Sequence, residues 1–132
     1  MKVFVYFNLH KKLFSVKALE GPEKGRVIAH KELLTLTNAT PKVSEKGRQR
    51  VLQERRKNVH AGIVGEWEPI DPDFYVPASA LFCIRDEVTY NPYKYKTFVY
   101  KRNEQEFNGS EYVVMCASDR SITSYEGMEY YM

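Results

Sequence analysis

The sequence predicts an α+β protein: a bent antiparallel sheet, or a partly open barrel, with one main helix over about residues 44–58 packed on it. Three observations indicate this fold class. Short runs of alternating apolar and polar residues recur along the chain, as in half-buried strands. The aromatic fraction is 14%, with ten tyrosines, and tyrosine favours strand surfaces. One segment alone has the start signal and the period of a helix.

The first third of the chain has the clearest strand signals. The segments KVFVYFN and LFSVKAL surround a polar turn at residues 8–12, which predicts a pair of strands. The sequence EGPEKG at 20–25 is typical of a loop, and residues 26–30 begin another strand. Residues 33–36 can extend the sheet until NATP at 38–41 interrupts it.

The rest of the chain supplies further strands at 61–67, 80–84, 96–101 and 112–117. Between the first two lies EWEPIDPDFYVP, whose three prolines and four acids predict a loop at about 66–79. The polar tail after Ser118 has no clear period and is left unassigned.

Length and charge indicate one domain, 1–132, with an uneven charge distribution. A chain of 132 residues can bury one core but not two. Residues 1–60 carry 14 basic and 5 acidic side chains, a balance of +9, whereas residues 61–132 carry 6 and 12, a balance of −6. The basic half therefore either faces a polyanion or is neutralised by the acidic half.

The cysteines and the hydropathy pattern favour a cytosolic protein. Cys83 and Cys116 lie in separate apolar runs, as buried thiols do, although a disulfide in a secreted protein is the alternative. No charged-then-apolar leader begins the sequence, and no apolar run approaches the roughly 20 residues of a membrane-spanning helix. We therefore expect no membrane role.

The predicted helix has two kinds of arginine. It begins at Ser44 and Glu45, a cap and an acid that suit a helix N-terminus. At about 100° per residue, Val51, Leu52 and Val59 lie within about 60° of Arg48. Arg55 falls in the same stripe, and Arg50 and Lys57 fall on the opposite side. We expect Arg48 and Arg55 to face the sheet and the other two to face solvent.

An inward guanidinium needs an anion or several carbonyl groups around it. One interpretation pairs Arg48 and Arg55 with carboxylates of the acidic half, such as those at 71–73 or 86–87. Alternatively, their long aliphatic stems carry the guanidinium groups to the solvent at the edge of the packed surface. The other interpretation places both arginines in a cleft where they bind a phosphate group.

Three histidines are candidate catalytic residues. His60 follows the Arg-rich helix, where an imidazole beside guanidinium groups can act as an acid, a base or a phosphate donor. A histidine at that position is also a common polar cap. Together with His10 or His30 it could form a metal-free phosphodiesterase site. The spacing of the three fits no metal-ligand pattern, so we expect no metal site.

A second candidate surface is YNPYKYKTFVYKR at residues 90–102. Aromatic side chains interleaved with lysines can stack bases and hold phosphates, which makes Tyr93 and Tyr95 candidates for stacking. Lysines on an edge strand also prevent aggregation, which is the alternative. The chain contains no phosphate-loop, dinucleotide, GxSxG or CxxC motif, and we expect no cofactor.

Four ordered blocks resemble a family of small accessory proteins encoded by tailed bacteriophages. They are KVFVYFNLHKKLFSV, KGRVIAH, GRQRVLQERRKNVHAGIVG and YNPYKYKTFV, which contain 51 of the 132 residues and lie between residues 2 and 99. The sequence NVHAG after an Arg-rich helix is a fairly specific part. The resemblance implies a phage protein in an infected bacterial cytoplasm. It implies no activity, and it does not extend to the final SITSYEGMEYYM.

Three functions follow, of which a non-enzymatic binder of nucleic acid or of a nucleotide phosphate is favoured. The alternatives are a metal-independent nuclease or phosphotransfer enzyme that uses His60 and a second histidine, and an inhibitor of a host protein that acts through the acidic segment at 66–87. All three suit host takeover or counter-defence, and the oligomeric state is open. The residues expected to bind nucleic acid or phosphate are Arg48, Arg50, Arg55, Arg56, Lys57, Asn58, His60, Tyr93 and Tyr95.

Overall fold

The computed structural model describes residues 1–56, 59–68 and 83–127. Within these ranges the chain forms nine strands and one helix. In chain order they are β1 (Lys2–Asn8), β2 (Leu13–Ala18), β3 (Val27–Lys31), β4 (Leu33–Val43), α1 (Glu45–Glu54), β5 (Ala61–Glu66), β6 (Cys83–Thr89), β7 (Val99–Tyr100), β8 (Ser110–Cys116) and β9 (Ser121–Gly127).

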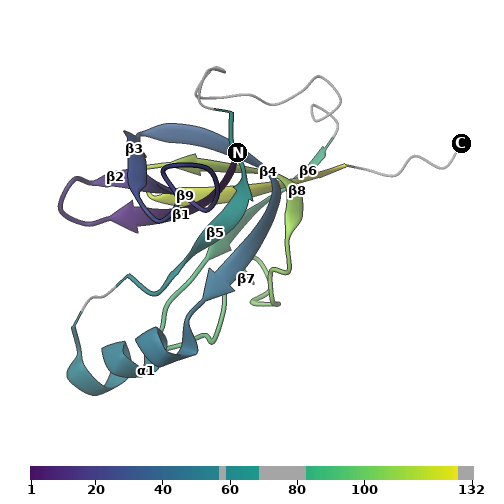
Figure 1. Cartoon of the computed structure of the whole chain (residues 1–132). Coiled ribbons are helices and arrows are strands. Elements are labelled where there is room, and N and C mark those ends of the chain that lie inside the picture. The colour runs from purple at the N-terminus through teal and green to yellow at the C-terminus, as the bar shows by residue number, and fades with distance from the viewer. Residues whose placement is uncertain (57–58, 69–82, 128–132) are drawn as a thin grey trace, which may run out of the picture.

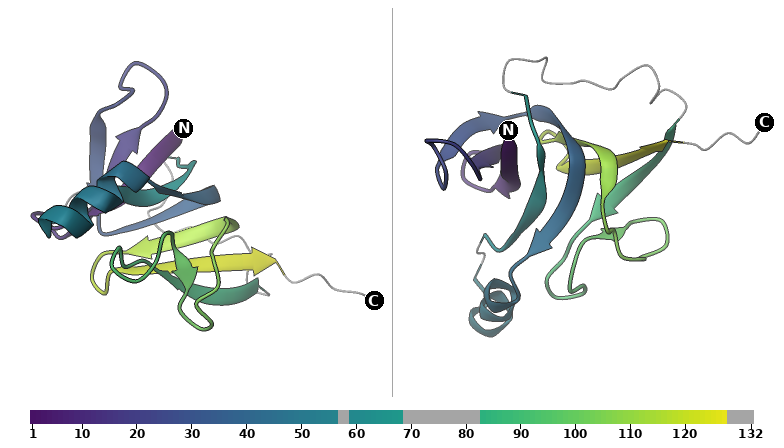
Figure 2. Two further views of the ribbon diagram at one scale, coloured as in Figure 1. Left: turned by 90° about the horizontal axis from the view of Figure 1, so that it is seen from below. Right: turned by 45° about the vertical axis from the view of Figure 1, so that its right-hand side comes forward.

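All nine strands belong to one antiparallel sheet, in the order β3-β2-β1-β5-β4-β8-β9-β6-β7. The two end strands do not pair with each other, so the described sheet is open. It bends strongly, and strands β1 to β5 form one layer while β6, β8 and β9 form another (Figures 1 and 2). The bent antiparallel sheet is therefore confirmed, although the helix is short and the sheet dominates the fold.

The core lies between these two layers, because strands from both contribute to one apolar cluster. Val3 and Val5 of β1 are completely buried, and the alternate residues of β1 lie on the opposite face. From the other layer, Val88, Val113 and Met115 join the same cluster. Bending the sheet thus lets one surface of it bury against itself, as domains of this size require.

Most strand predictions in the N-terminal half are confirmed. β1 and β2 surround the turn at 9–12, β3 starts one residue after the predicted Arg26, and β5 occupies 61–66. The prediction that the strand after Leu33 stops at the NATP sequence is wrong. β4 continues to Val43 by means of a bulge at Asn38, which has a φ of 48° and shifts the register against β5. Pro41 is tolerated because β8 pairs with β4 only as far as Ala39, which leaves Pro41 with one neighbouring strand.

The C-terminal half departs further from the sequence predictions. The predicted strand at 96–101 is reduced to the two residues of β7. The consecutive residues Phe98 and Val99 are both buried, so buried and exposed side chains do not alternate here as they do in a longer half-buried strand. The unassigned tail forms β9, a largely polar strand that joins β8 to β6. Cys116 is a half-buried free thiol. Residues 69–82, which include most of the predicted acidic loop and the start of the predicted strand at 80–84, lie outside the described residues.

Helix α1 does not lie across the sheet as expected. It starts two residues after the end of β4 and is held beyond the ends of β4 and β5 (Figure 1). In the described part of the chain, no helix is long and apolar enough to cross a membrane.

Candidate nucleic-acid interface

Helix α1 begins as the sequence predicts and ends earlier. The Ser44 hydroxyl caps its N-terminus by accepting a hydrogen bond from the Gly47 N–H at 3.2 Å. The helix ends at Glu54, because Arg55 adopts the left-handed conformation with a φ of 52° while its N–H donates to the Val51 carbonyl oxygen. The predicted helix over 44–58 is therefore too long, and Val51 is its one buried side chain.

Arg48 faces inward, as predicted. Its side chain is 11% exposed, and its Nη1 atom lies 3.1 Å from the Glu45 carboxylate one turn earlier. Its Nε atom donates to the Tyr95 carbonyl oxygen at 3.1 Å. The anion that Arg48 meets is therefore internal. It comes from the same helix and not from Asp86 or Glu87, which pair with Arg102 and Lys101; residues 71–73 lie outside the described residues.

The electrostatics of Glu45 agree with this pairing. The hydrogen bond from Gln49 is the largest influence, and it lowers the pKa of Glu45. Burial comes next and opposes it, and the charge and hydrogen bond of Arg48, followed by the charge of Lys96, lower the pKa further. Gln49 donates to the same carboxylate oxygen at 2.9 Å. Glu45 was not among the predicted site residues, although its position three residues before Arg48 is a known signal for an ion pair on a helix.

Arg55 is exposed, so the prediction that it faces the sheet is wrong. The helical projection assumes a continuous helix, and the left-handed residue at 55 ends that periodicity. Val59, the third residue of the predicted apolar stripe, is likewise 55% exposed. A cleft with Arg48 and Arg55 at its base does not form. Arg48 contacts groups of the protein itself, and Arg55 is an exposed cation.

His60 belongs to a joint that holds α1 against the rest of the fold. Its carbonyl oxygen accepts from the Ser44 N–H at 2.7 Å, and its Nε2 atom lies 2.7 Å from the Tyr90 hydroxyl. The Tyr90 ring in turn packs against buried Phe98, with centroids 5.0 Å apart. Burial raises the pKa of Tyr90, which the Arg48 charge partly opposes. The sequence placed Tyr90 in the candidate surface at 90–102 but gave no signal that it contacts His60, which lies 30 residues away.

Gly47 explains how closely α1 can approach this joint. A Cβ atom at residue 47 would lie 2.5 Å from the Cβ atom of His60, which is shorter than side chains tolerate. Glycine is otherwise unfavourable inside a helix by about 1 kcal/mol. Position 47 therefore requires glycine because α1 packs closely against His60, and not because glycine favours the helix.

The other two histidines lie on different elements. His10 is exposed in the turn after β1, where its backbone N–H donates to the side-chain oxygen of Asn8 at 3.0 Å. His30 lies on β3, and its Nδ1 atom is 2.9 Å from the hydroxyl of fully buried Ser15. Strands β2 and β1 separate β3 from β5, next to which His60 lies. Within the described residues, no hydrogen bond joins two of the three histidines.

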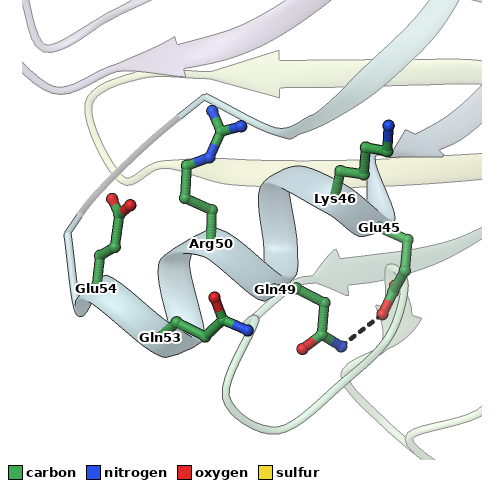
Figure 3. A pocket seen from close by; sticks show the side chains of 6 residues that line it. All are labelled: Glu45, Lys46, Gln49, Arg50, Gln53 and Glu54. Atoms are coloured by element: carbon green, nitrogen blue, oxygen red, sulfur yellow. Dashed lines mark hydrogen bonds between the residues drawn. The ribbon is translucent and has the colours of Figure 1, made fainter.

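Four exposed cations gather on α1 and just after it: Lys46, Arg50, Arg55 and Arg56. Among the residues that the structure describes, none of the four has an ion-pair partner. Lys46 and Arg50 project from the same side of the helix, over a shallow hollow that the helix lines with its own side chains (Figure 3). Lys57 and Asn58 lie outside the described residues.

The segment 91–97 forms a loop against the N-terminal part of α1. Tyr95 is half-buried, and its hydroxyl donates to Glu104 at 2.6 Å. Lys94 contacts the same carboxylate at 2.8 Å, and this hydrogen bond raises the pKa of Lys94. Tyr93, by contrast, is 60% exposed. Of the two predicted stacking residues, Tyr93 is accessible and Tyr95 is held by Glu104.

The described residues contain no cluster of three histidine, cysteine or acidic side chains that could hold a metal ion. Helix α1 and the two residues after it instead present exposed positive charge, with Glu45 and Glu54 on the same helix. Such a surface can attract phosphate groups without performing chemistry on them.

Comparison with known proteins relates this chain to a family of phage proteins. The model of the family described as Mycobacterium phage L5 gene 82 protein matches residues 1–123. The Gene 82 protein of Mycobacterium phage L5 is 40% identical over 124 residues, which cover 89% of this chain and 92% of that protein. No solved structure matches. The resemblance to a family of phage proteins is thereby confirmed.

Proposed function

Because this chain belongs to the family of the Mycobacterium phage L5 gene 82 protein, we propose that it acts in the infected bacterial cytoplasm as a non-enzymatic nucleic-acid-binding protein. Its contact with the phosphate backbone is made by the exposed cations of α1 and of the residues that follow, a group we call the basic surface: Lys46, Arg50, Arg55 and Arg56. Host takeover and counter-defence are the settings in which a phage protein would use such binding.

One observation carries this proposal. In the part of the chain that the structure describes, the basic surface places four cations without an ion-pair partner within eleven residues, whereas Lys94, Lys101 and Arg102 are paired with carboxylates. Each Lys or Arg that neutralises a phosphate releases counterions, so the affinity depends on salt. Arg48 is not part of this surface, because Glu45 and the Tyr95 carbonyl group already occupy it.

The test is a salt titration with fluorescent oligonucleotides, measured by anisotropy. We expect the affinity of the wild type to fall steeply with salt. The fourfold variant Lys46→Gln, Arg50→Gln, Arg55→Gln and Arg56→Gln should lower the slope of log K against log salt by about 0.7 for each lost contact on a single strand. At about 0.1 M salt, this corresponds to roughly a hundredfold loss of affinity or more.

A matched control removes the same charge elsewhere. Lys11, Lys12, Lys24 and Arg26 are also exposed, and they lie in the turns after β1 and β2. Their fourfold glutamine variant should keep most of the wild-type affinity and slope. If both variants lose affinity equally, only net charge matters and the basic surface has no specific role. If the wild type binds neither DNA, RNA nor a nucleotide at low salt, the proposed function is wrong.

A further inference from the structure

The outer face of the N-terminal layer carries aromatic side chains where a solvated sheet surface is usually polar. Val3 and Val5 point into the core, so Phe4 and Tyr6 of β1 lie on the opposite face, and both are partly exposed. Their ring centroids are 5.9 Å apart. Exposed apolar surface that is contiguous in this way marks an interaction site more often than scattered apolar residues do.

Glycine at position 62 lets the Phe4 ring lie close to the sheet. A Cβ atom at Gly62 would lie 2.7 Å from Cε2 and Cζ of Phe4 and would also contact the Val5 carbonyl oxygen. The Phe4 ring therefore covers the backbone of β5 at this point. Val64 on β5 is directly opposite Phe4, which extends the apolar surface to the next strand.

Lysines flank these rings on both sides. Lys17 of β2 is directly opposite Phe4, and Lys42 of β4 is directly opposite Gly62. In the described part of the chain, neither lysine has an ion-pair partner. The positions in register with Phe4 and Tyr6 on β2 and β5 are Lys17, Ser15 and Val64, none of them acidic. We call the surface made by Phe4, Tyr6, Lys17, Val64 and Lys42 the aromatic face.

We propose that the aromatic face is a stacking platform for single-stranded nucleic acid, an inference that rests on the proposed function and specifies its substrate. Rings in the centre of the face can stack on unpaired bases, and lysines at its two sides can hold the phosphates between them. A paired duplex does not offer its base faces to such rings. Glu66 lies two residues beyond Val64 on the same face, opposite Lys2, and its carboxylate already pairs with the N-terminal ammonium group at 3.3 Å. The positive charge of Lys17 and Lys42 beside the rings is what favours nucleic acid over a protein partner as the occupant.

The aromatic face and the basic surface can serve the same strand. Arg56 precedes Gly62 by six residues, so their Cα atoms lie within about 21 Å of each other. A platform of this kind binds several nucleotides, on the order of 4–16 per domain in comparable sheets. This distance is short enough for one strand of that length to contact both surfaces.

The test compares single-stranded and duplex oligonucleotides of the same length, with deoxythymidine and uridine strands to distinguish DNA from RNA. The double variant Phe4→Leu and Tyr6→Leu keeps apolar cover over Gly62 but removes both rings. We expect it to lose roughly a hundredfold in affinity for a single strand, about tenfold for each ring, with an unchanged salt slope and unchanged duplex binding. Tyr6→Phe, which retains the ring, should bind like the wild type.

Separate outcomes overturn the two proposals. If the double variant is folded, as judged by urea unfolding, and binds single strands like the wild type, the stacking platform is wrong while the basic surface stands. An equal loss for single strands and duplex also rules out stacking. Ultraviolet cross-linking of a thymidine strand provides a second readout, and cross-links at Phe4 or Tyr6 are expected. If the wild type binds no nucleic acid at low salt, the proposed function fails and the platform fails with it.

Discussion

Arg48 and Arg55 differ in their surroundings, although they lie two predicted helical turns apart on one side of the same basic segment. The Arg48 side chain is 11% exposed, and it contacts Glu45 and the Tyr95 carbonyl oxygen. Arg55 is exposed and ends the helix in a left-handed conformation. One arginine therefore joins the helix to the loop at 91–97, and the other presents its charge to solvent.

The difference shows that helical phase determines the direction of a side chain only while the helix lasts. Arg48 lies in the first turn after the N-cap, where the phase is well defined. Arg55 lies at the other end, and a single residue with positive φ changes the direction of everything after it. The same basic segment thus contains one cation that contacts the rest of the protein and a set of cations that are exposed to solvent.

The largest effect expected from this comparison is on stability. Arg48→Met retains the aliphatic stem but removes the guanidinium group, which leaves the Tyr95 carbonyl oxygen without this donor. We expect the free energy of unfolding to fall by about 1–2 kcal/mol. Arg55→Met is the matched control, and it should change stability by less than about 0.5 kcal/mol because Arg55 is exposed. Urea unfolding of the three proteins measures both values.

The same two substitutions should affect nucleic-acid binding in the opposite order, with the larger effect at Arg55. Arg55→Met removes a cation of the basic surface and is expected to weaken binding, whereas folded Arg48→Met should bind nearly as the wild type does. Equal destabilisation by the two substitutions would show that the two arginines do not differ in the way the structure indicates.

A smaller effect of opposite sign is expected from Arg55→Gly. Arg55 has a φ of 52°, a region that costs a non-glycine residue about 1–2 kcal/mol and costs glycine little. We therefore expect Arg55→Gly to raise the free energy of unfolding by about 1 kcal/mol. Glu54→Gly, one residue earlier and inside the helix, is the control and should lower it by about 1 kcal/mol. A destabilised Arg55→Gly protein would contradict the left-handed helix end.

The sequence predicted features that depend on neighbouring residues. The strands β1 and β2 follow from alternation over a few positions, and the start of α1 follows from Ser44 and Glu45. The inward direction of Arg48 follows from the helical period. Each of these signals operates over one or two turns or one strand pair, and tertiary packing did not reverse them.

Features that depend on distant residues could not be predicted in the same way. The Tyr95 carbonyl oxygen is 47 residues from Arg48, and Tyr90 is 30 residues from His60. Strand β9 is polar because only one of its faces meets the core, so its composition resembles that of a loop. The end of α1 was missed for another reason, since a left-handed arginine has no sequence signal comparable to a glycine.

The smallest expected effect concerns pH. The hydrogen bond from Gln49, the largest cause, and the charge of Arg48 lower the pKa of Glu45 in the folded protein, and burial partly opposes them. A carboxylate with a lowered pKa stabilises the fold above its ordinary pKa of 4.5, and the stabilisation is lost as the pH falls through the lowered value. We therefore expect the wild type and Glu45→Gln to differ in unfolding free energy at about pH 7, and we expect this difference to disappear as the pH falls towards about 3. Gln49→Met should reduce this difference in unfolding free energy, because it removes the hydrogen bond that contributes most to the lowered pKa of Glu45. Gln53→Met, on the exposed side of the same helix, should leave the difference unchanged. A difference that stays constant across this pH range would show that the charge of the Glu45 carboxylate does not stabilise the fold.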